Sequence, residues 1–386
     1  MTQDSSTRSA ETPALGVAMV GHSFMGAVHS QAWRSVSRFF DLPRAPRMVA
    51  LGGRDAQRTA QAAERMGWES VETDWRALLR RDDVDLVDIC TPGDTHAEIA
   101  VAALEAGKHV LCEKPLANTV AEAERMVSAA EAAERRGVFS MVAFNYRRVP
   151  ALALARRMVA EGRIGDVRHV RAMYLQDWLS DAESPMSWRL RKEQAGSGAL
   201  GDIGAHIVDA AQFVTGQHVT GVSALTETFV RKRPGEQGPE DVTVDDCAVF
   251  TARFSSGAVG SFEATRYALG RKNAMRLEVN GSRGSIAFDF ESMNELWFYD
   301  GDEDPDTAGF RRVVVTEPTH PYLGAWWPPG HLLGYEHTFT HELADLVTAI
   351  GEGRPPEPSF ADGLRVQRVL RAVEDSAAAD SVATRI

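Results

Sequence analysis

The run Leu15-Gly16-Val17-Ala18-Met19-Val20, followed directly by Gly21-His22-Ser23-Phe24-Met25-Gly26, determines the fold of the first third of this chain. The apolar run predicts a buried strand, the glycines predict a tight turn, and residues 28–36 continue with helical spacing. A strand, a glycine turn and a helix in this order are the setting of a dinucleotide-binding fingerprint. Backbone N–H groups at the start of the helix, together with its dipole, would hold a pyrophosphate.

The fingerprint is incomplete, because Ser23 stands where the second glycine of G-x-G-x-x-G belongs. An ordinary strand–helix turn is therefore the competing interpretation of this loop. If the loop binds a dinucleotide, the residues that we expect to contact it are Gly21, Ser23, Phe24, Met25 and Gly26.

The same alternation continues along the chain. Further strands are predicted at residues 48–51, 84–90, 109–112 and 139–144, and helices at residues 56–66, 96–106 and 119–136. Strands alternating with helices predict a doubly wound parallel sheet, the Rossmann arrangement, with helices on both faces. Ligands bind at the carboxyl ends of such strands, which places residues 21–26, 52–55, 91–96, 113–115 and 145–147 along one edge.

The end of the second strand bears on cofactor preference. Gly52 and Gly53 occupy the place where an acidic residue usually binds the adenosine ribose. Arg54 could pair with a 2′-phosphate or stack on adenine, and Asp55 could reach the ribose, but a solvated Arg–Asp turn explains the pair equally well. The sequence therefore leaves NAD and NADP both open.

Glu113-Lys114-Pro115 follows the carboxyl end of the strand predicted at residues 109–112. A lysine at the mouth of a buried sheet, beside a proline that fixes the chain, is an unusual place for a merely solvated charge. A neighbouring pyridinium would disfavour its ammonium form. We expect Lys114 to hydrogen-bond substrate and ribose hydroxyls or to relay a proton.

Residues 196–213 combine four glycines with a helical apolar run. Asp202 and His206 lie four residues apart, so a helix would place them on one face. The pair predicts a base and its partner, whereas a helix cap with a nearby histidine is the simpler alternative. The spacing would also suit a metal, but no further ligand cluster accompanies it, and we expect no metal.

Composition excludes several classes of protein. The chain has 386 residues and a formal net charge of −12, which argues against a nucleic-acid partner. Its three cysteines lack metal-type spacing and suit a reducing cytoplasm. Residues 1–13 are polar and predict a disordered tail rather than a signal peptide. No run of about 18 apolar residues occurs, so we expect no membrane span.

A second domain is predicted for residues 149–386, after a dinucleotide-binding domain at 14–148. Alternating strands are expected at residues 167–176, 219–225, 248–254, 259–265, 275–279, 285–290 and 295–299. Their tight hairpin spacing favours an open, largely antiparallel sheet with helices on one face, giving an α+β domain after the α/β one. Residues 318–329 are rich in proline and predict a long loop that reaches over the site or into a neighbouring subunit.

Aromatic residues beside polar ones predict a sugar site, because sugars present apolar C–H faces and hydroxyl edges. Three clusters have this character, although the tryptophans could equally be core or interface residues: Gln176-Asp177-Trp178, Ser187-Trp188-Arg189 and Gly334-Tyr335-Glu336-His337.

Taken together and in this order, the glycine loop, Thr91-Pro92 with His96, Glu113-Lys114-Pro115, Asn145-Tyr146-Arg147 and Asp202-x-x-x-His206 resemble the Gfo/Idh/MocA oxidoreductases. The resemblance covers nearly the whole chain, and runs such as residues 141–148 and 195–203 look most like the levoglucosan dehydrogenase branch. Gly93 and Gly52-Gly53 depart from the family pattern, which leaves the cofactor preference open but not the reaction class.

The resemblance implies NAD(P)-dependent oxidation of a secondary hydroxyl of a sugar, a levoglucosan-like anhydrosugar or a cyclitol. His206 would be the general base, Asp202 would hold the hydroxyl region or bias the imidazole, and Lys114 would bridge ribose and substrate. Further cofactor contacts are implied for Arg54, Thr91, Pro92, His96, Glu113, Lys114 and Asn145. Substrate contacts are implied for Lys114, Tyr146, Arg147, Gln176, Trp178, Trp188, Asp202, His206 and Tyr335.

Two other functions stay open on the sequence. A hydrolase of the same family would use transient sugar oxidation to cleave a glycoside without net cofactor consumption. A non-catalytic dinucleotide-binding regulator is disfavoured, because this chain keeps both Lys114 and His206. The family's second domain often mediates assembly, so we expect a homo-oligomer, either a dimer or a tetramer.

Overall fold

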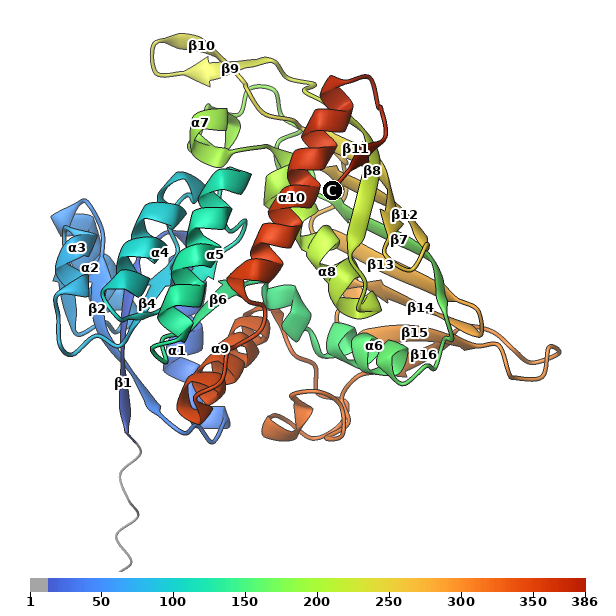
Figure 1. Cartoon of the computed structure of the whole chain (residues 1–386), viewed down its shortest axis with the longest axis horizontal. Coiled ribbons are helices and arrows are strands. Elements are labelled where there is room, and N and C mark those ends of the chain that lie inside the picture. Colours follow the sequence, from blue (N-terminus) through green and yellow to red (C-terminus); the bar gives the residue numbers. More distant parts are fainter. Residues whose placement is uncertain (1–12) are drawn as a thin grey trace, which may run out of the picture.

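The N-terminal part of the molecule is a sheet of six parallel strands in the order β3-β2-β1-β4-β5-β6, seen in the computed structural model of residues 13–386 (Figure 1). The tail predicted for residues 1–13 lies outside the described residues, apart from Pro13. The strands are β1 (Ala14–Val20), β2 (Ala45–Gly52), β3 (Ser70–Glu72), β4 (Leu86–Ile89), β5 (His109–Glu113) and β6 (Ser140–Ala143). The helices between them are α1 (Phe24–Phe39), α2 (Ala56–Met66), α3 (Trp75–Leu79), α4 (His96–Glu105) and α5 (Val120–Glu134).

This strand order confirms the predicted doubly wound sheet. The order reverses between β1 and β4, and ligands bind at such a switch point. Six consecutive residues of β1, from Leu15 to Val20, are buried, as expected for a parallel strand covered on both faces.

The glycines of the first loop are required by close backbone approach. Gly21 has a φ of 99°, and a Cβ there would lie 2.7 Å from the carbonyl oxygen of Cys90. A Cβ on Gly26 would lie 2.3 Å from the carbonyl oxygen of Gly21. These two residues therefore let the start of α1 lie directly against the ends of β1 and β4.

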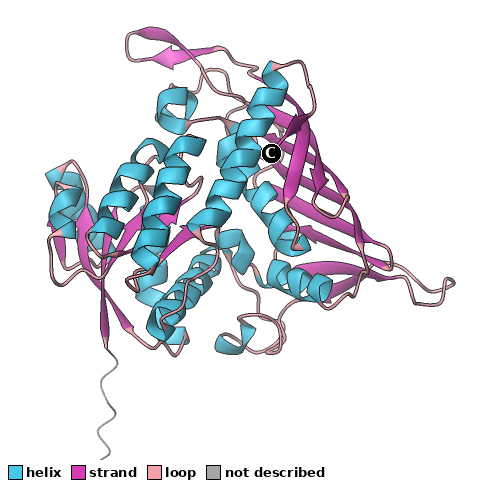
Figure 2. Ribbon diagram, viewed as in Figure 1, coloured by secondary structure: helices cyan, strands magenta, loops and turns pink. Residues whose placement is uncertain are grey.

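The second sheet has nine strands in the order β16-β15-β14-β13-β7-β12-β11-β8-β17. Only the β7–β12 pair is parallel among the neighbours in this sheet, which confirms the largely antiparallel prediction within the described residues. Helices α6 (Pro150–Ala160), α8 (Ala205–Thr215) and α10 (Phe360–Ala378) lie on one face of it, and no helix of residues 13–386 covers the other face (Figure 2). The strands are β7 (Val167–Leu175), β8 (Val219–Glu227), β11 (Cys247–Phe254), β12 (Val259–Thr265), β13 (Ala274–Gly281), β14 (Gly284–Asp289), β15 (Glu295–Asp300), β16 (Arg311–Val314) and β17 (Thr384–Arg385).

Three elements differ from the prediction. A hairpin of β9 (Lys232–Gly235) and β10 (Gly238–Asp241) projects beyond the second sheet (Figure 1). The stretch at residues 196–213 is not one regular helix, because a π-helical turn, Leu200–Gly204, precedes α8. Helix α9 (Tyr335–Glu352), although within the segment assigned to the second domain, packs its buried apolar side chains into the same cluster as β1 and α1.

The loop at residues 318–329 lies on the N-terminal part of its own chain. Trp326 packs on Phe39 with ring centroids 4.2 Å apart, and its Nε1 donates to His341 Nε2 at 2.7 Å. Within the described residues, no residue of this loop lines the large cavity discussed below. No helix in the described part of the chain is long and apolar enough to cross a membrane.

Candidate active site

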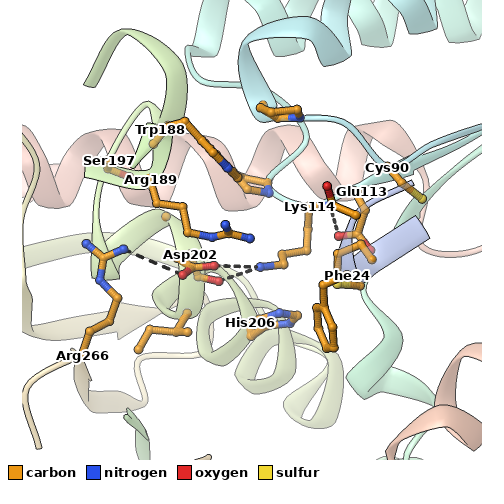
Figure 3. Close-up of a pocket in the computed structure, with 18 of the residues that line it drawn as sticks. Phe24, Cys90, Glu113, Lys114, Trp188, Arg189, Ser197, Asp202, His206 and Arg266 are labelled. Carbon is orange, nitrogen blue, oxygen red and sulfur yellow. Dashed lines mark hydrogen bonds and ion pairs between the residues drawn. The ribbon is translucent and has the colours of Figure 1, made fainter. Parts of the chain in front are cut away.

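A cavity of about 710 Å³ lies between the two sheets, at the carboxyl ends of the parallel strands. The start of α1, the loops after β4, β5 and β6, the π-helical turn with α8, and α9 all contribute to its wall. Figure 3 shows side chains from both sheets converging on this space. The site residues predicted from the sequence that line this cavity are Ser23, Phe24, Met25, Thr91, Pro92, His96, Glu113, Lys114, Asn145, Tyr146, Gln176, Trp178, Trp188, Asp202, His206 and Tyr335.

The start of α1 can accept an anion. Ser23 is the N-cap residue, but its side chain makes no capping hydrogen bond, and the first turn contains no acidic residue. The first-turn N–H groups are therefore not satisfied by this chain's own cap, which is the arrangement that binds phosphate at helix N-termini. Gly21 and Gly26 do not line the cavity and instead shape the loop that does.

His96 joins two loops of the wall. Its Nε2 lies 2.8 Å from the carbonyl oxygen of Thr91, and its Nδ1 lies 3.0 Å from that of Pro115. The ring is almost wholly buried. The contacts that His96 makes within the chain therefore hold the loop after β4 against the loop that carries Lys114.

Arg54 lies at the end of β2, is exposed and does not line the cavity. Asp55 caps α2 by accepting the backbone N–H of Arg58 at 3.0 Å. A Cβ on Gly53 would lie 2.4 Å from Thr59 Oγ1 and 2.8 Å from the ring of His22. The packing of these two side chains explains why a glycine replaces the usual acidic residue here.

Lys114 reaches across the cavity to Asp202. Its Nζ donates to the backbone carbonyl of Asp202 at 2.7 Å and lies 3.5 Å from Oδ1 of the same residue. Arg266 Nη1 lies 3.8 Å from Asp202 Oδ2 (Figure 3). Burial alone would raise the pKa of Asp202, but Lys114, Arg266 and Arg189 together lower it below its usual value. Asp202 is therefore a carboxylate surrounded by three cations.

His206 occupies the first turn of α8 and is nearly buried. Burial, assisted by the charge of Lys114, lowers its pKa well below 6.5, so the imidazole is neutral near pH 7. Its Nδ1 has no hydrogen-bond partner among the described residues. The expected contact with Asp202 is absent, because the Asp202 carboxylate faces Lys114 and Arg266 and the intervening turn is π-helical rather than α-helical.

A chain of hydrogen bonds lines the side of the cavity that the second sheet forms. Tyr146 and Tyr174 share a hydrogen bond of 2.6 Å, and Tyr174 donates to Asn273 Oδ1 at 2.7 Å. Gln176 Nε2 donates to the same oxygen at 2.8 Å, and Trp178 Nε1 donates to Gln176 Oε1 at 3.0 Å. The ring of Tyr146 also lies 4.5 Å from that of His206, so this array continues to the histidine.

Arg147 is the one predicted substrate residue that the structure directs elsewhere. Its guanidinium binds Asp209 through two hydrogen bonds of 2.8 and 2.5 Å, and it does not line the cavity. Asp209 lies on α8, so this buried pair attaches α8 to the loop after β6. Asn145 does line the cavity, and its amide donates to Thr338 Oγ1 of α9 at 2.9 Å.

The sequence did not identify several residues of the wall. Arg266 is one of them and lies 5.6 Å from the ring of Trp178, whereas Arg189, which belongs to a predicted sugar-site cluster, stacks on Trp188 with 4.4 Å between the guanidinium and the ring centroid. Arg266 directly follows β12, and no motif marks it in the sequence. Gly93 and Pro115 lie in segments predicted at the ligand-binding edge, and the other unpredicted lining residues are Cys90, Asn118, Tyr174, Ala195, Ser197, Gly201, Ile203 and Asn273.

Comparison with known proteins gives matches over both parts of the chain. Residues 15–143 match the family model described as an oxidoreductase family with an NAD-binding Rossmann fold, and residues 152–287 match the GFO/IDH/MocA C-terminal domain. A levoglucosan dehydrogenase of Pseudarthrobacter phenanthrenivorans is 43% identical over 383 residues, which covers 95% of this chain and 97% of that protein.

Two solved structures are similar over almost their entire length. An oxidoreductase domain protein from Kribbella flavida has 66% identity and a TM-score of 0.95, covering 97% of this chain and 99% of its own. A levoglucosan dehydrogenase in complex with NADH and levoglucosan has 43% identity and a TM-score of 0.93, with the same coverage.

Proposed function

This chain belongs to the Gfo/Idh/MocA family of NAD-binding oxidoreductases, and from that premise we propose that it oxidises a secondary hydroxyl of a sugar, with a levoglucosan-like anhydrosugar as the preferred substrate. The observation that carries the proposal is a single cavity in which Lys114, Asp202 and a neutral His206 face the open start of α1. This arrangement puts a proton acceptor and two hydrogen-bonding groups beside a nucleotide-binding edge.

The residues around α1 suit a dinucleotide, since the uncapped N–H groups can hold its pyrophosphate. NAD, when bound, would accept the hydride that leaves the substrate carbon. NADH complexes of a related dehydrogenase support NAD as the partner. Because Arg54 is exposed at the end of β2, assays should include NADP as well.

His206 accepts the proton of the reacting hydroxyl. Its neutral state near pH 7 leaves a ring nitrogen free to act as a base. Lys114 and Asp202 hold the hydroxyls beside it, Lys114 by donating and the Asp202 carboxylate by accepting. Trp178, Trp188 and the tyrosines supply flat apolar surfaces for the C–H faces of the ring.

The direct test is His206→Ala, assayed by absorbance of reduced nicotinamide with levoglucosan, inositols and hexoses. We expect kcat to fall by about two to four orders of magnitude, the usual contribution of a general base. Affinity for NADH, measured by calorimetry, should change little, because the substitution leaves the first-turn N–H groups of α1 that would hold the pyrophosphate unchanged.

His331→Ala is the matched control, since His331 is exposed and lies outside the cavity. Its kcat should equal that of the wild type. Wild-type turnover by His206→Ala would remove His206 from the mechanism. Glycoside cleavage by the wild type without net NADH formation would replace the proposed dehydrogenase with the hydrolase alternative.

A further inference from the structure

His29 lies in the second turn of α1, and a carboxylate faces each of its ring nitrogens. Its Nδ1 lies 3.0 Å from both oxygens of Asp88 on β4, and its Nε2 lies 3.0 Å from Glu113 Oε1 on β5. All three side chains are buried. An imidazole that donates at both nitrogens is protonated, so His29 is an imidazolium between two anions.

Glu113 connects His29 to the proposed active site. Its other oxygen, Oε2, accepts the backbone N–H of Lys114 at 3.0 Å. Lys114 in turn donates to Asp202. Since Glu113 lines the cavity directly beside Lys114 (Figure 3), a continuous set of hydrogen bonds runs from the nucleotide-binding helix to the catalytic lysine.

Asp88 anchors the other end of the network. It accepts Trp33 Nε1 at 2.8 Å in addition to His29, and the Cys90 thiol lies 3.5 Å from its Oδ1. In the described part of the chain, His29, Asp88 and Cys90 are the one group of three whose ligand atoms converge closely enough for a metal ion. Burial raises the pKa of the Cys90 thiol, and every polar atom of the group is already paired, so hydrogen bonding accounts for the cluster without a metal.

We infer that His29 is a positioning residue for Lys114. Its ring binds both Asp88 and Glu113, holds Glu113 Oε2 on the N–H of Lys114, and so fixes the backbone at which Lys114 enters the cavity. The inference rests on the proposed function, because that function gives Lys114 its place on the substrate.

The surrounding charges are consistent with this role. Burial lowers the pKa of His29, but Asp88 and Cys90 raise it, and the net effect is well above 6.5. Burial raises the pKa of Glu342 on α9 to about 8, so this neighbour is neutral near pH 7 and adds no third anion. The titratable groups that face His29 from adjoining elements are Asp88, Cys90, Glu113, Tyr335 and Glu342.

His29→Gln tests the inference through the pH profile of kcat. Without the imidazolium, two buried carboxylates lack a cation, and because burial disfavours their charged forms we expect the pair to bind a proton. We expect kcat at pH 7 to fall by about 10- to 100-fold, as for a slightly misplaced catalytic group. We also expect a new acid limb, with activity recovering as pH rises and the carboxylate pair releases that proton.

His29→Gln/Glu113→Gln removes the titrating group and should abolish that limb. Should His29→Gln fail to fold, Asp88→Asn provides the opposite test. It retains the His29–Glu113 pair but loses the main group that raises the pKa of His29, so an alkaline limb should appear instead. NADH affinity should stay within about threefold of the wild-type value in His29→Gln and Asp88→Asn, since both leave the first-turn N–H groups and Glu113 unchanged.

An equal loss of kcat at every pH, or a limb that persists in the double variant, would show that His29 only supports the fold. Failure of the proposed function is separable, because it appears in the wild type alone: NADH binds, but no sugar is oxidised. The inference fails only where the wild type is active and the variants lack the new limbs.

Discussion

Lys114 determines the charge environment of both residues that we assign to the substrate hydroxyl. Its ammonium group lies against Asp202 and is the one charged side chain that contributes to lowering the pKa of His206. The same cation therefore adds to burial in lowering the pKa of His206 and, with Arg266 and Arg189, lowers the pKa of Asp202. The proposed base and the proposed carboxylate acceptor thus have suitable protonation states at neutral pH without a hydrogen bond between them.

Replacing Lys114 should change the titration of His206 in a defined direction. In Lys114→Met the charge is lost while burial remains, so the pKa of His206 should rise but stay below that of an exposed histidine. Histidine NMR titration measures this without any need for turnover. Lys192→Met, which removes an exposed lysine paired with Glu374, should leave the His206 signal unchanged. A downward shift in Lys114→Met would contradict the assignment of this cause.

Single residues were predicted from the sequence where a motif fixes the backbone around them. Lys114 follows a strand end and His206 opens a helix, but the family resemblance, more than this local pattern, singled out both, and both line the cavity. Arg147, implied by the same resemblance, does not line it, because it binds the buried Asp209, which lies 62 residues away. Arg266 was missed for a similar reason: it lines the cavity through a pairing of β12 with β7 and β11 that no local pattern reveals.

At the scale of elements, Asp245 holds the glycine-rich turn that carries Asp202. Its Oδ1 accepts the N–H of Gly198 at 2.7 Å, and its Oδ2 accepts that of Leu200 at 2.8 Å. A Cβ on Gly198 would lie 1.7 Å from the carbonyl oxygen of Asp245, so only glycine permits this approach. The turn is thus shaped by its contact with Asp245, which lies just before β11 of the second sheet.

Asp245→Asn should weaken catalysis by loosening this turn. An amide has one acceptor oxygen, so one N–H loses its partner and faces an NH₂ group, at a cost of about 1–3 kcal/mol. We expect kcat to fall by about 10-fold while NADH affinity is kept. Steady-state kinetics would measure the loss, and Asp241→Asn, in the exposed part of β10, is the control. A wild-type kcat in Asp245→Asn would mean that the turn holds its shape without the carboxylate.

Helices and strands were predictable where burial follows a regular period. The strand β11 alternates between exposed and buried residues along most of its length, and β1 is continuously buried, and both patterns are visible in the sequence. The π-helical turn at Leu200–Gly204 was not predictable, because apolar spacing alone does not distinguish it from an α-helix. The packing of α9 on the N-terminal sheet depends on tertiary contacts and escaped prediction too.

At the scale of the whole molecule, α9 packs against the first sheet and buries an acidic side chain there. Glu342 is fully buried, and neither of its carboxylate oxygens has a hydrogen-bond partner among the described residues. Its pKa rises from 4.5 to about 8 through burial, so the folded protein retains a proton that the unfolded chain releases. Stability from this group is therefore complete below about pH 4.5 and is lost as pH rises toward 8.

Glu342→Gln should remove that dependence, because a neutral amide has no proton to lose. We expect the thermal unfolding temperature of the variant to increase relative to that of the wild type as the pH is raised from 5 to 8. Calorimetry at several pH values would measure the difference. Glu352→Gln, exposed at the end of the same helix, should show no such gain. Parallel pH profiles of Glu342→Gln and wild type would contradict a raised pKa at Glu342.

The uncovered face of the second sheet bears on assembly. On this face, Leu225 of β8 and Val249 of β11 are paired in register, and both are substantially exposed. Val259 and Trp297 on other strands of the sheet are exposed as well. The helices cover only the opposite face (Figure 2), so the apolar residues here have no partner within the described chain. We expect this face to bind a second copy in the predicted homo-oligomer.

Val249→Glu should dissociate that assembly. A two-fold interface would bring each new carboxylate into the same apolar patch, where an unpaired charge is costly to bury. Size-exclusion chromatography with light scattering should show a smaller species than the wild type, while NADH binding is retained because the cavity lies between the sheets, away from this face. Val71→Glu, on the exposed edge strand of the first sheet, is the matched control and should leave the mass unchanged. If Val249→Glu kept the wild-type mass, the copies would meet through another surface.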